Sequence, residues 1–272
     1  MLIAAVDIGS VATKALLWST EDQSVVAVGQ RPSAWQPAQA AAEALRGLAE
    51  AAPGRRPDLL AVTGYGRNLL DRTDETLTGY YSGSAEPFQF NEITALARGV
   101  NRLAPEVRLI LDVGGQDSKA LAIDGQGRVL DFMLNDKCAA GAGAFIDAIC
   151  QSFNLDHAGF AALAAEGKPV PLSSMCTVFA QTELVAQIAR GVSRADLAAG
   201  ILASLAARLK TQCGRLFSQN PVALTGGLSR MPIFAEFLSQ SLGLPVTAPD
   251  RAPFLAALGA ALMAGERVSP AQ

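Results

Sequence analysis

The chain has 272 residues, half of them hydrophobic, and a formal net charge of −3. This length and apolar content are sufficient for one large or two modest globular domains with a sizeable core. The charge provides no basic face for nucleic acid, and no apolar run is long enough to cross a bilayer. The N-terminus lacks the features of a signal peptide, and four cysteines are too few for a disulfide scaffold. We therefore expect a cytoplasmic protein with neither a nucleic-acid nor a membrane partner.

The first glycine turn, at residues 7–14, follows an apolar run at residues 2–6 and precedes another at 15–18. Two short strands around a glycine-and-hydroxyl turn predict a hairpin. Gly9 would let the backbone approach a phosphate closely, while Ser10 and Thr13 offer hydroxyls and Lys14 offers positive charge. Taken alone, this turn is more consistent with an ordinary hairpin.

The second turn, at residues 112–119, repeats the scheme between apolar runs at 109–111 and 120–123. In both turns the lysine is the seventh residue after the aspartate, at Asp7 and Lys14 and again at Asp112 and Lys119. This matched spacing predicts an internal repeat. Two such hairpins facing each other would hold a polyphosphate from both sides, and the two aspartates would bind Mg²⁺ through water.

The remaining pattern predicts helices at 38–52, 92–103 and 232–242, a strand at 59–63, and an apolar helix at 253–264. Pro105 ends the second helix and marks a candidate domain boundary near residue 104. A third turn, at residues 225–227, contains the paired glycines Gly226 and Gly227. Paired glycines would let the backbone lie flat against the nucleoside end of a ligand.

The four cysteines fall into two classes. Cys138 and Cys176 each precede a run with helical periodicity, where a helix N-terminus lowers the pKa of a thiol and favours metal binding. The alternatives for this pair are two buried thiols or half of a zinc site. Cys150 and Cys213 lie within apolar stripes and are expected in the core. His157, the one histidine, is expected to be a solvated loop residue.

At this point the motifs resemble a known superfamily. Asp7-Ile8-Gly9, Asp112-Val113-Gly114-Gly115 and Thr225-Gly226-Gly227 resemble the two phosphate motifs and the adenosine motif of the sugar-kinase, heat-shock-protein and actin superfamily. The resemblance spans nearly the whole chain and implies an α/β, actin-like ATPase of two lobes with the nucleotide in the cleft between them. We expect an N-terminal lobe at 1–104, a second lobe at 105–252, and a C-terminal helix at 253–272 that packs back on the first lobe.

Two further segments narrow the resemblance. Asn135-Asp136-Lys137-Cys138-Ala139-Ala140-Gly141 and Cys176-Thr177-Val178-Phe179-Ala180 are similar to segments of the ATP-dependent activators of 2-hydroxyacyl-CoA dehydratases, relatives of the ATP-binding subunits of benzoyl-CoA reductase. The family implies an oxygen-sensitive homodimer in which Cys138 and Cys176 of both copies hold one [4Fe-4S] cluster. ATP hydrolysis would then drive electrons from a ferredoxin or flavodoxin to an acyl-CoA dehydratase or reductase.

The resemblance also implies roles for individual residues. Asp7, Asp112 and Gln116 are the catalytic candidates, with Asp117 a weaker one. The nucleotide-binding candidates are Gly9, Ser10, Thr13, Lys14, Gly114, Gly115, Asp136, Gly141, Gly143, Glu183, Gly226 and Gly227. For Glu183, a favourable position in the helix dipole is an equal alternative. Movement of the loop at Gly141 and Gly143 is expected to pull on the helix that follows Cys138.

The chain departs from the family pattern at two places. Ala95 and Leu96 stand where some activators have a Cys-His pair, and Gln181 stands where an acidic residue is usual. Two other functions are consistent with the motifs. One is a small-molecule kinase of the same fold, for example an N-acetyl-sugar kinase with Asp112 as the base. The other is a non-catalytic, nucleotide-dependent binding module.

Overall fold

The computed structural model describes residues 1–69, 86–135, 142–172, 177–216 and 220–268, without the side chains of 177–182 and 215. The chain divides into two compact units. Unit 1 comprises Met1–Glu106, Ile123–Val129 and Pro253–Gln272, and unit 2 comprises Val107–Ala122 and Leu130–Ala252. Among the described helices, none is both long and apolar enough to cross a membrane.

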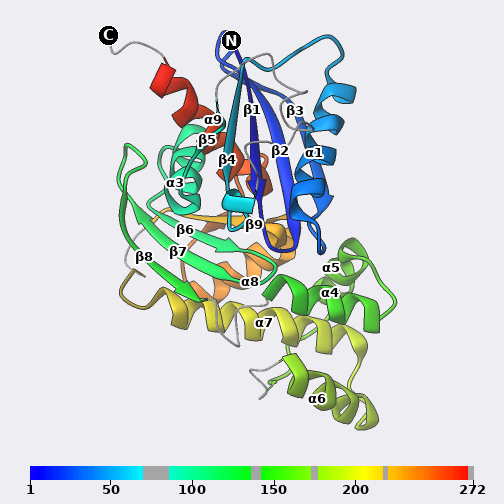
Figure 1. Cartoon of the computed structure of the whole chain (residues 1–272). Helices are drawn as coiled ribbons and strands as arrows, with labels where there is room; N and C mark the ends of the chain where they lie inside the picture. The colour runs from blue at the N-terminus through cyan, green and yellow to red at the C-terminus, as the bar shows by residue number, and fades with distance from the viewer. Residues whose placement is uncertain (70–85, 136–141, 173–176, 217–219, 269–272) are drawn as a thin grey trace. The chain divides into compact units, whose positions relative to one another are not determined.

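Unit 1 is built on a five-stranded mixed sheet of order β3-β2-β1-β4-β5 (Figure 1). Its strands are β1 (Leu2–Ile8), β2 (Ala12–Ser19), β3 (Ser24–Pro32), β4 (Leu59–Thr63) and β5 (Phe88–Gln89). The central strand β1 is antiparallel to β2 and parallel to β4. This register places Asp7, near the end of β1, directly opposite Lys14 of β2 and Thr63 of β4.

Helices cover both faces of this sheet. Helix α1 (Pro37–Ala51) has proline in its first turn and packs its alanine- and leucine-rich side onto one face. Helix α9 (Leu255–Val268) packs against β1, β4 and α3 (Glu92–Leu103). The crossing of α3 and α9 is very close, because a Cβ placed on Gly259 would lie 1.7 Å from the Ala95 carbonyl oxygen. Glycine is therefore required where these two helices meet.

Unit 2 repeats the strand arrangement of unit 1. Its sheet has the order β10-β9-β6-β7-β8, with β6 antiparallel to β7 and parallel to β9. The strands are β6 (Leu109–Val113), β7 (Ser118–Ile123), β8 (Val129–Asn135), β9 (Val222–Gly226) and β10 (Val246–Thr247). In each unit the first strand and its hairpin partner carry one of the two turns. The internal repeat predicted from the matched turns is confirmed by these sheets.

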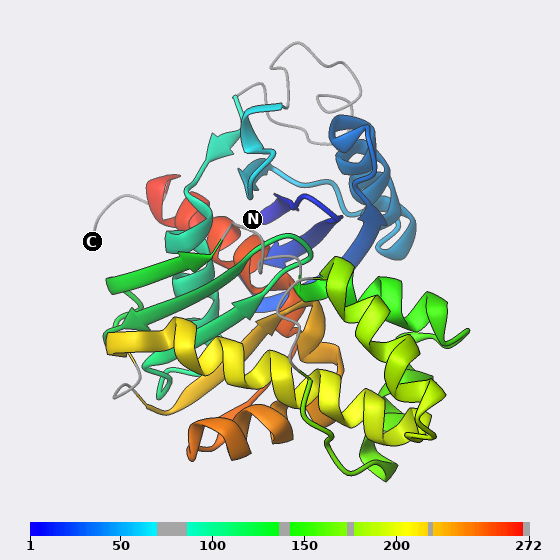
Figure 2. The same cartoon turned by 90° about the horizontal axis from the view of Figure 1, so that it is seen from below.

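The described part of unit 2 contains five α-helices. They are α4 (Ala142–Ser152), α5 (His157–Glu166), α6 (Thr177–Ala189), α7 (Arg194–Cys213) and α8 (Pro232–Leu242). Figure 2 shows α7 lying along one face of the sheet, where its stripe of leucine, isoleucine and cysteine packs against β6 and β9. The predicted core location of Cys150 and Cys213 is confirmed, since they are 4% and 0% exposed.

His157 is solvated as predicted, with 43% of its side chain exposed, but it lies in a helix and not in a loop. It is the first residue of α5, which is capped by the Asp156 side chain accepting from the Gly159 N–H. The His157 ring lies 2.7 Å from the Asp147 carboxylate of α4. Aspartate is a favourable N-cap residue, and here the Asp156 carboxylate satisfies a backbone N–H in the first turn of α5.

Candidate functional site

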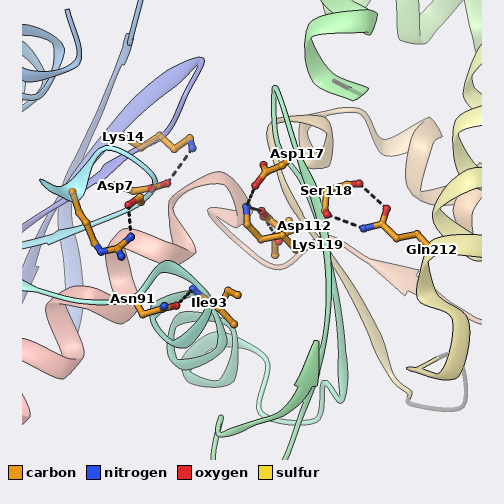
Figure 3. Close-up of polar contacts among 12 residues, drawn as sticks. Asp7, Lys14, Asn91, Ile93, Asp112, Asp117, Ser118, Lys119 and Gln212 are labelled. Atoms are coloured by element: carbon orange, nitrogen blue, oxygen red, sulfur yellow. Dashed lines mark hydrogen bonds and ion pairs between the residues drawn. The ribbon is translucent and has the colours of Figure 1, made fainter. Parts of the chain in front are cut away.

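The first turn holds a buried carboxylate. Asp7 is only 4% exposed, and its Oδ2 lies 3.1 Å from the Lys14 ammonium group (Figure 3). Its Oδ1 is also buried, yet it has no hydrogen-bond partner among the described residues. Leaving such an oxygen unsatisfied costs roughly 1–3 kcal/mol, so a bound ligand or water normally completes it. Asp7 is therefore a suitable acceptor for an Mg²⁺-bound water.

A chain of hydroxyls supports the loop of the first turn. The Ser33 hydroxyl donates to the Gly9 carbonyl at 2.6 Å, so the Thr13 hydroxyl must be the donor in its 2.9 Å contact with Ser33. Thr13 is fully buried, and its hydroxyl proton is donated to the Ser33 hydroxyl. The Thr13 hydroxyl therefore supports the loop, and the expected contact of Thr13 with phosphate stays a prediction. Ser10 is half-buried, with no hydrogen bond to its side chain from the described residues.

The second turn fixes its aspartate on both sides. Asp112 Oδ1 accepts a hydrogen bond of 2.6 Å from the Thr225 hydroxyl of β9. Asp112 Oδ2 lies 3.5 Å from the Lys119 ammonium group, which is also 2.7 Å from Asp117. Figure 3 shows Lys119 between the two carboxylates, and all of Asp112, Lys119 and Thr225 are buried. Gln116 is exposed on this loop.

The N-terminal residues of α4 are hydrogen-bonded directly to the second glycine turn. The backbone N–H groups of Gly143 and Ala144 donate to the carbonyls of Gly114 and Gly115 at 3.1 and 3.0 Å. A Cβ on Gly143 would lie 2.7 Å from the Gly114 oxygen and 2.9 Å from the Gly115 Cα, so only glycine permits this approach. Any displacement of the loop at Gly114 and Gly115 must therefore be transmitted to α4 or break these hydrogen bonds.

The third turn lies beside the second. Gly226 has φ of +79°, and a Cβ there would lie 2.3 Å from the Val113 carbonyl oxygen, so it too must be glycine. Gly227 has open space where its side chain would be. Because β6 and β9 are parallel neighbours, the second and third turns emerge from the same edge of the sheet.

Other predicted site residues are less well placed or lie outside the described residues. Asp136, Cys138, Gly141 and Cys176 all fall in the segments that the structure does not describe. Glu183 is the seventh residue of α6 and half-buried, beyond the first turn in which the helix dipole acts. The family departures Ala95 and Leu96 are buried in α3, and the Gln181 side chain is not described. Within the described residues, no group of three or more acidic, histidine or cysteine side chains is arranged to hold a metal.

Two contributors to the site were missed from the sequence. Ser33, directly after β3, donates a hydrogen bond to the Gly9 carbonyl, and Thr225 of the neighbouring strand β9 donates one to Asp112. A signal for the second was present, since Thr63-Gly64 and Thr225-Gly226 both end an apolar strand in corresponding positions of the repeat. No local pattern identifies Ser33, because its contact spans 24 residues.

The duplicated sheets and aspartate turns define the fold of an actin-like ATPase, as the sequence predicts. A solved structure supports this assignment: the activator of the 2-hydroxyisocaproyl-CoA dehydratase from Clostridium difficile, with bound ADPNP. It matches with a TM-score of 0.86 at 30% identity, over all of both chains.

The chain belongs to the BadF/BadG/BcrA/BcrD ATPase family, whose profile matches residues 5–264, and it is an ATPase. It is 33% identical to the (R)-2-hydroxyglutaryl-CoA dehydratase activating ATPase of Acidaminococcus fermentans over 97% of each chain. It is also 35% identical to the 2-hydroxyisocaproyl-CoA dehydratase activator of Clostridioides difficile, over 76% of this chain and 80% of that one. The predicted family resemblance is confirmed.

Proposed function

We propose that this ATPase is an iron–sulfur electron donor, which uses ATP hydrolysis to drive low-potential electron transfer to a partner acyl-CoA dehydratase or reductase. The observation that carries the proposal is the attachment of α4 to the second turn through Gly143 and Ala144. Cys138 precedes α4 by only four residues, so the loop proposed to bind phosphate and the proposed cluster ligand belong to one connected segment.

The nucleotide half of the function rests on the two turns. Gly9, Ser10 and Lys14 of the first turn and Gly114 and Gly115 of the second are proposed to bind the phosphates. Asp7, with its unsatisfied buried oxygen, is proposed to hold Mg²⁺ through water.

Water is the proposed nucleophile for hydrolysis. Asp112 and the exposed Gln116 are proposed to position it, because phosphoryl transfer depends chiefly on positioning and charge neutralisation. The paired glycines Gly226 and Gly227 are proposed to lie at the nucleoside.

The redox half rests on Cys138 and Cys176. Four thiolates are the usual ligands of a [4Fe-4S] cluster, so two copies of the chain would supply them. Helix α6 begins directly after Cys176, which favours the thiolate form of a ligand at that place. When bound, the cluster supplies one-electron transfer, and the protein residues would set its exposure and its charge environment.

Exposed apolar side chains flank both cysteine segments and support a protein partner there. Leu130, Phe132 and Leu134 alternate along the edge strand β8, and they are 64%, 46% and 47% exposed. This strand ends three residues before Cys138. Helix α6 likewise exposes Val185 and Ile188. We propose that a second copy and the acceptor enzyme cover these surfaces.

The relatives guide the choice of the acceptor enzyme. Since the named relatives activate 2-hydroxyacyl-CoA dehydratases, a dehydratase is the proposed acceptor. A ferredoxin or flavodoxin is the proposed electron donor. A cytoplasmic location is also proposed, because the few cysteines of the chain favour a reducing compartment.

Anaerobic purification tests the proposal. The wild-type chain should be a brown dimer with about four iron atoms per two chains, because two cysteines from each chain would supply the four thiolates of one [4Fe-4S] cluster. Cys138→Ala and Cys176→Ala should abolish iron binding, whereas the matched core variant Cys150→Ala should retain it. An iron-free monomer that phosphorylates a sugar would contradict the proposal and favour the kinase alternative.

A further inference from the structure

The two turns place the same three residue types in one row across three neighbouring strands. In unit 2 the row is Thr225, Asp112 and Lys119, and in unit 1 it is Thr63, Asp7 and Lys14. Each aspartate lies on the central strand, with lysine opposite on the hairpin partner and threonine opposite on the parallel neighbour. Both threonines are fully buried, so neither hydroxyl is satisfied by solvent.

The hydrogen bonds in the two rows differ despite the matching positions. Thr225 donates to Asp112 Oδ1 at 2.6 Å, while Lys119 contacts the other oxygen, Oδ2. Thr63 instead donates to the Phe90 carbonyl at 3.2 Å, just beyond β5. Asp7 Oδ1 is consequently left without a partner among the described residues.

The second row has an additional carboxylate. Lys119 contacts Asp117 as well as Asp112, whereas the corresponding position of the first turn is Ala12. Lys119 is therefore held between two anionic groups, and Asp112 is held between Lys119 and Thr225. A contact to each of its two oxygens fixes the rotation of the Asp112 carboxylate. A single ion pair to one oxygen would not fix it.

We propose that Thr225 and Lys119 are positioning residues for ATP hydrolysis, which hold the Asp112 carboxylate in one orientation by its two oxygens. The two aspartates then have different tasks. Asp7 keeps one buried oxygen available for a ligand, and Asp112 acts as a fixed acceptor toward the reacting water or its neighbours. The inference rests only on the ATPase activity, so its test needs neither iron nor a partner enzyme.

The test compares three variants of the full chain with wild type. Thr225→Val removes the hydroxyl and keeps the shape, Thr225→Ser restores the hydroxyl, and Thr63→Val removes the matching hydroxyl from the first row. Steady-state ATP hydrolysis gives kcat and KM, and titration with a fluorescent ADP analogue, with and without Mg²⁺, gives nucleotide affinity. Thermal unfolding measures separately how much each substitution changes the stability of the protein.

Thr225→Val should lower kcat at least tenfold, with KM and ADP affinity within about threefold of wild type, because an orienting contact acts on the transition state. Thr225→Ser and Thr63→Val should keep kcat within about threefold. An unchanged kcat in Thr225→Val, or an equal loss in Thr63→Val, would overturn the proposal.

If Thr225→Val does not fold, Thr225→Cys keeps the volume with a weak donor and should show the same loss of kcat. Wild-type turnover in Thr225→Cys would then overturn the inference. If the wild-type chain itself does not hydrolyse ATP, the result contradicts the ATPase assignment and not the role of Thr225.

Discussion

Burial sets the chemistry of Cys150 and Cys213 at the scale of single side chains. Desolvation raises the pKa of each thiol from about 9 to about 11, and for Cys150 the nearby carboxylates of Asp147 and Asp156 add to the effect. Both groups therefore stay protonated at neutral pH and are poor metal ligands. Their helical spacing among leucines and isoleucines was enough to predict this from the sequence.

The raised pKa values predict a loss of stability at high pH. Unfolded thiols lose their protons near pH 9, whereas the folded ones keep them until about pH 11. The free energy of unfolding should therefore fall between these values, by roughly 1 kcal/mol per thiol per pH unit. Urea unfolding at pH 8, 9.5 and 10.5 measures this fall. It should be less steep in Cys150→Ala and Cys213→Ala, and an unchanged slope in both variants would contradict the burial argument.

At the scale of elements, close glycine contacts determine which segments move together. Gly143 joins α4 to the second turn, and Gly259 joins α9 to α3. In both cases the neighbouring atom is backbone, which cannot rotate away as a side chain can. Gly47 provides a matched control, since a Cβ there meets only the flexible end of Arg31, at 3.4 Å.

Gly143→Ala should separate α4 from the second turn. The new Cβ would overlap the Gly114 carbonyl, so the two backbone hydrogen bonds must lengthen or break. We expect ATP hydrolysis to fall at least tenfold, because the loop loses its support. Steady-state kinetics tests this, and Gly47→Ala should keep wild-type turnover. Normal turnover in Gly143→Ala would show that α4 does not support the loop.

Gly259→Ala should destabilise unit 1. Overpacking of a close contact costs typically 1–3 kcal/mol, and the clash here is with the Ala95 carbonyl. We therefore expect a loss of about 2 kcal/mol or more in the free energy of unfolding. Gly47→Ala, in a helix interior, should instead gain roughly 0.5–1 kcal/mol. Chemical unfolding measures the free energy of unfolding of both variants. Equal values for Gly259→Ala and Gly47→Ala would contradict the close contact between α3 and α9.

The sequence predicted most elements but failed for β8, for a physical reason. Along this strand the large apolar side chains Leu130, Phe132 and Leu134 are exposed, while Asp131 and Asn135 are half-buried. The half-buried positions also include the apolar residues Val129 and Met133, so large apolar side chains lie on both faces and the strand lacks the usual alternation of apolar and polar residues. The three glycine turns were predictable because steric limits act locally, whereas the Thr225 and Ser33 contacts depend on strand pairing across the fold.

At the scale of the whole molecule, the protein is a duplicated unit whose copies have diverged. The sheets share one strand order and one row of threonine, aspartate and lysine. Among the described residues, both carboxylate oxygens have a partner in the second copy, whereas one oxygen of Asp7 has none in the first. In unit 2 the second turn also contacts the helix that follows Cys138. The proposed coupling of ATP hydrolysis to electron transfer therefore depends on unit 2.

The reduction potential of the proposed cluster, measured with bound ATP and with bound ADP, tests this coupling most directly. If loop movement is transmitted through Gly143 to α4, the potentials should differ by about 60 mV or more, a tenfold change for one electron. In Gly143→Ala the difference should shrink, with the iron content unchanged. Equal potentials in the wild-type protein, with the cluster intact in both nucleotide states, would contradict the account.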